Sequence, residues 1–129
     1  MHLRARSIVL LILSLFIAAK LNASALQWDG NGKIHVEFVE GRQKKVKVGF
    51  TFKNAGDHPV SITRVKTDCK CVTAELGRKT IAAGGRGLVI VLFDVEGLTG
   101  LQEKYITVTT DEPNEQPARL LLQVIIKTQ

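Results

Sequence analysis

The chain has 129 residues, of which 45% are hydrophobic and 23% charged, and its formal net charge at pH 7 is +6. This length allows one hydrophobic core, so we expect a single domain. Half of the net charge comes from Arg4, Arg6 and Lys20 near the amino terminus. The remaining excess of positive charge is small and spread along the chain, which argues against a nucleic-acid partner, because that function needs clustered Lys and Arg. The one cluster, at residues 42–47, is more typical of a hairpin shoulder and the solvated face of a strand than of a phosphate-binding surface.

The amino-terminal segment MHLRARSIVLLILSLFIAAKLNASA places two arginines before an uncharged run from Ile8 to Ala19. The run is too short for a spanning helix, which needs about 20 apolar residues, but it suits a secretory signal peptide. Ala23-Ser24-Ala25 supplies the small residues of a cleavage site. We expect cleavage after residue 25, no stable membrane span afterwards, and a periplasmic or secreted location. A retained membrane anchor is the alternative.

Residues 26–129 are expected to form one domain, in which apolar residues recur at every second position. The clearest case is KVKVGFTFKN, whose alternation is typical of a strand with one buried face. Turn residues separate the runs, and no amphipathic stretch is long enough for a crossover helix. The sequence therefore predicts an all-β antiparallel sandwich of about seven strands. These strands are predicted at residues 34–39, 45–54, 60–65, 69–74, 88–95, 105–110 and 120–127.

The alternation also predicts which side chains form the core. Leu88 to Phe93 is apolar at every position, which predicts a central strand covered on both faces. The predicted core comprises Val46, Val48, Phe50, Phe52, Ile62, Val91, Ile106, Val108, Leu122 and Val124.

The only two cysteines, Cys69 and Cys71, lie in the stretch TDCKCVTAEL. On an extended strand, residues i and i+2 have Cα atoms about 6.6 Å apart, which is long for a disulfide. A bond across so short a loop also removes little entropy from the unfolded chain. We therefore expect no stable structural disulfide between them. The parity of Val72, Ala74 and Leu76 predicts that the two thiols face solvent.

Two thiols on one face could form a redox pair or bind a soft metal ion. Lys70 would favour a reactive thiolate, and His58 across the preceding turn could act as a base. Two Cys and two His could in principle complete a zinc site, although their spacing is not that of a zinc finger. No nucleophile-elbow motif surrounds Ser61, so we expect no hydrolytic or transfer chemistry and no cofactor.

Three sequence blocks occur in order: FTFKNAGDHPVSITRVKTDCKCVTAEL, IAAGGRGLVIVLFD and GLQEKYITVTTDEPNEQPARLLLQVII. Together they resemble the bacterial DUF1573 family, which groups domains of unknown function with an immunoglobulin-like fold. The resemblance covers roughly residues 26–127 and implies an immunoglobulin-like sandwich and an export route, but no established activity. The family motif usually reads Cys-Gly-Cys-Thr, where this chain has Cys69-Lys70-Cys71-Val72.

By elimination and by analogy with other sandwiches, we expect an exported, non-catalytic binding or scaffolding module of the bacterial cell envelope. Its partner is expected to be another envelope protein. The alternative is a thiol site, redox-active or metal-binding, at Cys69 and Cys71, with His58 and Lys70 as possible accessory residues.

Overall fold

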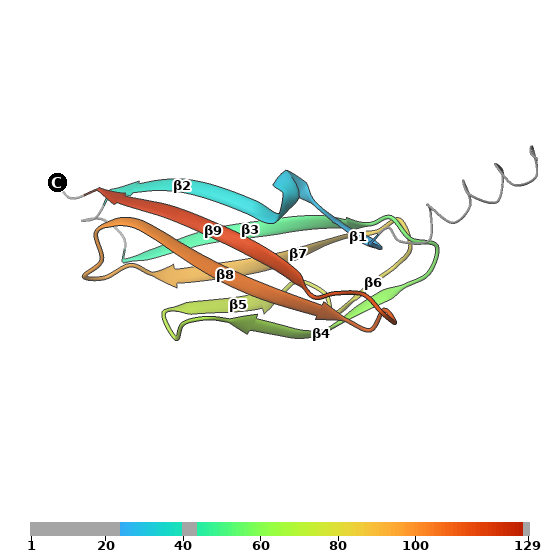
Figure 1. Ribbon diagram of the computed structural model, residues 1–129. Coiled ribbons are helices and arrows are strands. Elements are labelled where there is room, and N and C mark those ends of the chain that lie inside the picture. The colour runs from blue at the N-terminus through green and yellow to red at the C-terminus, as the bar shows by residue number, and fades with distance from the viewer. Residues whose placement is uncertain (1–23, 40–43, 128–129) are drawn as a thin grey trace, which may run out of the picture.

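The alternating strands assemble into two β-sheets that pack face to face in a computed structural model (Figure 1). The structure describes residues 24–39 and 44–127. The predicted signal peptide falls outside these ranges, apart from its last two residues. Within the two described ranges, no helix has the length and apolar character that crossing a membrane requires.

The described residues form nine strands: β1 (Leu26–Trp28), β2 (Lys33–Val39), β3 (Lys45–Asn54), β4 (Val60–Thr67), β5 (Val72–Leu76), β6 (Thr80–Ile81), β7 (Arg86–Asp94), β8 (Gly100–Thr110) and β9 (Ala118–Lys127). The first sheet has four antiparallel strands in the order β1-β3-β7-β5, and the second has five in the order β2-β9-β8-β4-β6. The predicted all-β, immunoglobulin-like sandwich is thereby confirmed. All seven predicted strands are present, β3 with the predicted ends and the other six with shifted ends, and two short strands, β1 and β6, add to them.

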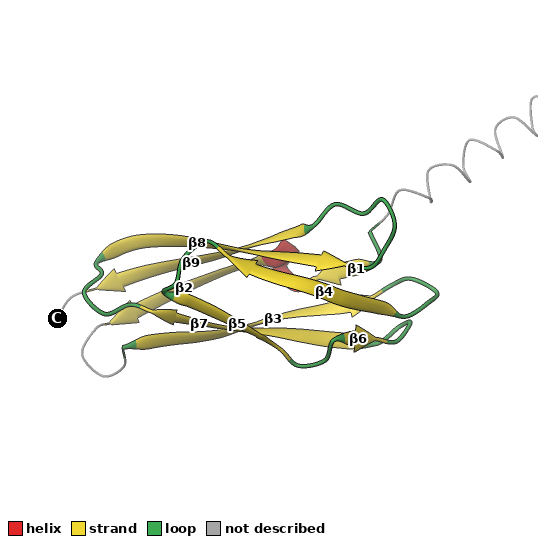
Figure 2. Cartoon of the chain, turned by 90° about the horizontal axis from the view of Figure 1, so that it is seen from below, coloured by secondary structure: helices red, strands yellow, loops and turns green. Residues whose placement is uncertain are grey.

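One strand pair departs from the predicted antiparallel arrangement, because β2 runs parallel to β9. The chain leaves β1 in the first sheet and enters β2 in the second through a short turn of 3-10 helix, η1 (Asp29–Gly32), drawn red in Figure 2. Gly30 and Gly32 have φ values of +62° and +71° there. A Cβ at Gly32 would lie 2.9 Å from a methyl carbon of Leu120. Glycine therefore allows the chain to change sheets close to the core.

The core lies between the two sheets and matches the predicted set closely. Nine of the ten predicted residues are buried, and Val48 is half-buried and packs against them. Phe50, Phe52 and Phe93 are the largest fully buried side chains. The Phe52 ring contacts Trp28, with 4.6 Å between ring centroids.

The prediction that β7 is covered on both faces is only half right. The strand is central in its sheet, between β3 and β5, and Val89, Val91 and Phe93 are fully buried. Leu88, Ile90 and Leu92 have the opposite parity and are only half-buried. An apolar run in a sandwich strand can therefore have one face outside the core.

Candidate functional site

Cys69 and Cys71 lie in the turn that joins β4 to β5 and thus connects the two sheets (Figure 2). The Val72 N–H donates to the Cys69 carbonyl at 3.1 Å and closes this turn. Thr67 Oγ1 lies 3.3 Å from the carbonyl oxygen of Cys69 and 3.1 Å from that of Val72. The Thr67 hydroxyl therefore ties the end of β4 to the start of β5.

The turn brings the Cα atoms of Cys69 and Cys71 to 5.1 Å, and their sulfur atoms form a disulfide. The expectation of no disulfide is wrong, because it assumed that the strand begins at Cys69. The strand begins at Val72, and a turn makes the i to i+2 distance shorter than the roughly 6.6 Å of an extended chain. Two bonded sulfurs offer no thiolate to a metal. Within the described residues, no group of three or more His, Cys, Asp or Glu could hold a metal ion.

Both cysteines are half-buried, whereas Lys70 between them is exposed. Cys71 packs against the core, and its N–H donates to Cys69 Sγ at 3.0 Å. The predicted parity holds along β5, where Val72 is buried and Thr73 is exposed. It does not extend to the cysteines, because the turn breaks the alternation before them.

β5 is the last strand of its sheet, so one side of its main chain has no neighbouring strand. The Asp94 N–H donates to the Cys71 carbonyl at 2.8 Å, and the Gly77 N–H donates to the Leu88 carbonyl at 3.0 Å. Bonded positions alternate along an antiparallel strand. The odd-numbered residues of β5 therefore bond to β7, and the N–H and C=O groups of Ala74 and Leu76 point away from it. Within the described residues these outward groups make no hydrogen bond.

Basic side chains lie at both ends of this open strand. Lys70 in the cysteine turn and Arg78 and Lys79 in the loop after β5 are exposed, and within residues 24–39 and 44–127 none of the three forms an ion pair. Asp68 and Glu75 are the acidic residues of the same segment. We call β5 together with Lys70, Arg78 and Lys79 the basic edge.

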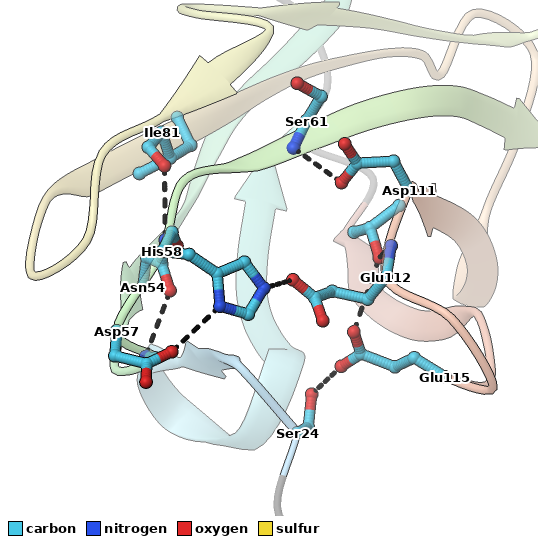
Figure 3. Close-up of polar contacts among 11 residues, drawn as sticks. Ser24, Asn54, Asp57, His58, Ser61, Ile81, Asp111, Glu112 and Glu115 are labelled. Atoms are coloured by element: carbon cyan, nitrogen blue, oxygen red, sulfur yellow. Dashed lines mark hydrogen bonds and ion pairs between the residues drawn. The ribbon is translucent and has the colours of Figure 1, made fainter.

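His58 lies in the β3–β4 loop, at the other end of β4 from the cysteines. The eight residues of β4 extend over about 26 Å at 3.3 Å per residue, so His58 is not the base of a Cys-His pair. Its Nδ1 lies 2.8 Å from Asp57 Oδ1 and its Nε2 2.5 Å from Glu112 Oε1 (Figure 3). These contacts join the β3–β4 loop to the β8–β9 loop. The hydrogen bond with Asp57, and next the one with Glu112, raises the pKa of His58.

Protonation of His58 should stabilise the fold over a limited pH range. Because the pKa of His58 is raised in the folded state, the stabilisation is complete below the pKa of the unfolded state, about 6.5. It is lost as pH rises through the pKa of the folded state. The hydrogen bond from His58 lowers the pKa of Asp57, whose stabilising effect is lost as pH falls through that lowered value. We expect His58→Gln to reduce the unfolding free energy most near about pH 5–6, and to have least effect at pH well above the folded value. Urea unfolding across pH measures this difference.

The Glu112→Gln variant provides the matched comparison for the His58 prediction. It keeps the shape of the β8–β9 loop residue but removes one of the two carboxylates that bond to His58. It should therefore remove part of the pH-dependent stabilisation that protonated His58 provides. A loss of stability in His58→Gln that stays constant from acidic to alkaline pH would mean that the histidine acts through packing alone.

Ser61 lies at the same end of the sandwich, but its hydrogen bonds go to groups other than His58. Its hydroxyl lies 2.8 Å from Thr80 Oγ1, and its N–H donates to Asp111 Oδ1 at 2.9 Å. Both ring nitrogens of His58 are engaged by carboxylates. A serine nucleophile needs a hydrogen bond to its base, and the described residues do not supply one here.

A family model described as "Protein of unknown function (DUF1573)" matches residues 26–126. The chain belongs to the DUF1573 family. The resemblance carried by the three sequence blocks is confirmed by this match. A comparison of the DUF1573 chain with curated proteins gave no match.

Solved structures similar to the DUF1573 chain share its fold at low identity. A protein of unknown function from Porphyromonas gingivalis W83 is 18% identical, with a TM-score of 0.62 over 81% of this chain and 50% of that one. The VesB protease of Vibrio cholerae is 16% identical, with a TM-score of 0.65 over 85% and 34%. A PapD-like domain of human CEP192 is 11% identical, with a TM-score of 0.61 over 83% and 88%. The DUF1573 chain thus spans half or less of the first two proteins.

Sequence reasoning missed two features of the DUF1573 domain. The pairing of His58 with Glu112 joins loops that are 54 residues apart in the chain, and no local pattern indicates such a contact. The open edge of β5 follows from strand order, which alternation does not specify. The one local signal for this edge in the sequence was the concentration of basic residues around the cysteines, between Arg64 and Lys79.

Proposed function

We propose that the DUF1573 domain is a non-catalytic binding module of the bacterial cell envelope that contacts a partner protein through an open sheet edge. The observation that supports this role most directly is the unpaired main chain of Ala74 and Leu76 on β5. An exposed edge strand is a template for pairing with another chain. The similar PapD-like domain of CEP192 shows that such sandwiches occur as modules of larger proteins.

The proposed location rests on two observations. The amino-terminal segment has the charge and apolar pattern of a secretory signal peptide. The disulfide between Cys69 and Cys71 suits an oxidising compartment, since disulfides persist outside the cytosol and are rare within it. We therefore propose a periplasmic or secreted location, with another envelope protein as the partner.

Site-specific photo-crosslinking in living cells tests the binding role. A photoreactive amino acid is placed in turn at Ala74 on β5, at His35 on β2 and at exposed Leu101 on β8. The full-length protein is expressed at its natural level, and crosslinked products are identified by mass spectrometry. We expect one defined protein to crosslink from at least one of these surfaces. If all three surfaces yield only unlinked protein, the binding role is wrong.

The disulfide favours a second candidate, a thiol–disulfide exchange site. A thiolate of a dithiol protein would attack one sulfur and form a mixed disulfide, while the other cysteine leaves as a thiolate. The second thiol of the attacking protein would then release the DUF1573 domain in its dithiol form, so that two electrons and two protons are transferred. The Cys71 N–H beside Cys69 Sγ would stabilise a leaving thiolate at Cys69.

The disulfide should contribute little to the stability of the fold if its role is redox exchange. A large loss of stability on its removal would indicate a structural role instead. The loop-entropy relation gives about 1.5 kcal/mol for a loop of three residues. We expect Cys69→Ser/Cys71→Ser to lower the unfolding free energy by about this amount and to remain folded. The oxidised protein should be lighter than the reduced protein by two hydrogen atoms. The redox candidate fails if glutathione buffers reduce the disulfide only after denaturation.

A further inference from the structure

We propose that the basic edge binds an extended acidic segment of the partner protein, which adds to the first sheet as a fifth strand beside β5. This inference rests on the proposed binding function and specifies the surface and the chemistry of the segment. Three properties of the edge support it: its unpaired main-chain groups, its half-buried apolar side chains and its excess of positive charge.

The main chain of β5 offers a short, defined pairing site. The outward N–H and C=O groups of Val72 are engaged by the Cys69 carbonyl and the Thr67 hydroxyl. Those of Ala74 and Leu76 are unpaired within the described residues. An added strand would therefore bond at these two residues, where donors and acceptors alternate as a β-ladder requires.

The side chains at this edge determine which kind of residue one face of the added strand should carry. Ala74 and Leu76 are half-buried and pack against the core, and so does Val65 on neighbouring β4. An apolar side chain of the added strand would lie on the same face and cover these residues. Burial of apolar surface would add to the main-chain hydrogen bonds. The segment should therefore have apolar residues at alternate positions.

Charge determines the rest of the segment. The basic edge has three exposed cations, with two acidic residues in the same segment, and within the described residues none of these cations forms an ion pair. Lys70 precedes β5, and Arg78 and Lys79 follow it, so cations lie at both ends of the strand. Carboxylates of an added strand would meet this excess of positive charge, which favours acidic residues in the partner.

The other open strands do not combine these properties. β1 and β6 are three and two residues long, so they offer little main chain. β2 is longer, but its exposed charges are mixed, and Glu37 is paired with Lys127 of β9. Lysines on an edge strand also deter unspecific pairing. If the cations of the basic edge only deter pairing, no added strand should bind, whatever its charge. If they select an acidic segment, an acidic peptide should bind and a basic one should not. Peptides of opposite charge therefore distinguish the two roles.

Amide hydrogen exchange of the folded, disulfide-bonded protein tests the proposal. The probe is an eight-residue peptide with blocked ends in which valine alternates with glutamate, and the control peptide has lysine in place of glutamate. We expect the glutamate peptide to slow exchange at Ala74 and Leu76 about tenfold or more, as hydrogen bonding at an open edge should. Thr73 and Glu75 already bond to β7 and serve as internal controls. The lysine peptide should leave all four amides unchanged.

Two variants and one control variant separate the contributions of charge and main chain. Lys70→Glu/Arg78→Glu/Lys79→Glu should weaken binding of the glutamate peptide by about tenfold or more. Lys45→Glu/Lys47→Glu/Lys53→Glu makes the same charge change on exposed positions of β3 and should weaken it much less. Ala74→Pro removes one outward N–H without removing a bond to β7, and proline is tolerated at such edge positions. It should abolish the protection at Leu76.

The proposal is overturned if the glutamate peptide does not slow exchange at Ala74 and Leu76, or if both peptides slow it equally. Equal weakening by the two triple variants would also overturn it, because binding would then follow overall charge. Crosslinking of a partner from β2 or β8 alone would contradict this inference and leave the proposed binding function intact. Absence of any crosslink would remove both.

Discussion

Replacing Phe52 with alanine should lower the unfolding free energy by about 3–5 kcal/mol, the usual cost of removing a buried phenylalanine ring. Phe52 is fully buried, and its ring lies against Trp28 of β1. Because a domain is stable by only about 5–15 kcal/mol, this change should shift the urea midpoint strongly. Lys53→Ala is the matched control, since Lys53 is exposed on the same strand.

The packing of the Phe52 ring can also be tested from the neighbouring strand β7. Gly87 is paired with Phe52 across β3 and β7, and a Cβ at Gly87 would overlap the Phe52 ring. Gly87→Ala should therefore destabilise the fold by overpacking, typically about 1–3 kcal/mol. In Phe52→Ala the space is empty, so the two changes together should cost less than their sum. Additive effects would mean that the ring and Gly87 are not in contact.

Asn54→Ala should be the most costly change of a polar side chain, at about 2–4 kcal/mol, since several buried groups lose their partners. Asn54 is fully buried. Its Nδ2 donates to the carbonyls of His58 and Ile81 at 2.9 and 3.1 Å, and its Oδ1 accepts the Gly56 N–H at 3.0 Å. These bonds connect the end of β3 to the following loop and to β6. Urea unfolding with linear extrapolation measures the loss.

Asn54→Asp separates hydrogen bonding from packing at this site. The substitution keeps the volume and the acceptor for Gly56 but removes the two Nδ2 donors and places a carboxylate beside two carbonyl oxygens. It should destabilise the domain at neutral pH at least as much as alanine does. If Asn54→Asp is as stable as the unchanged protein, the contacts of the amide do not matter for folding.

Local alternation was sufficient to predict the strands that form the core. In β3, apolar and polar residues alternate over the whole strand, so its place, its inner face and Phe50 and Phe52 in the core could all be predicted. β1 and β6 could not be, because two or three residues do not define a period. The parallel pairing of β2 depends on positive φ at Gly30, Asn31 and Gly32, which the sequence Asp-Gly-Asn-Gly permits but does not require.

The candidate site was predicted less well than the core. The residues Cys69, Lys70 and Cys71 were identified as a unit, but their geometry was wrong because the strand that contains Val72 was extended two residues too far toward the amino terminus. Main-chain direction changes at Asp68, where no proline or glycine marks a turn. The basic edge required knowledge of which strand is last in its sheet, a property of the whole chain.

The parallel pairing of β2 with β9 has a mechanical consequence. β9 is the last strand of the domain, and β2 lies near its start, with seven residues of β2 in register with Leu121 to Lys127. When two parallel neighbours are pulled in opposite directions along their length, the load is shared by all the hydrogen bonds between them. These bonds must then break together instead of opening one after another. Tension that reaches β2 and β9 would therefore meet its greatest resistance at this pair, before the core is exposed.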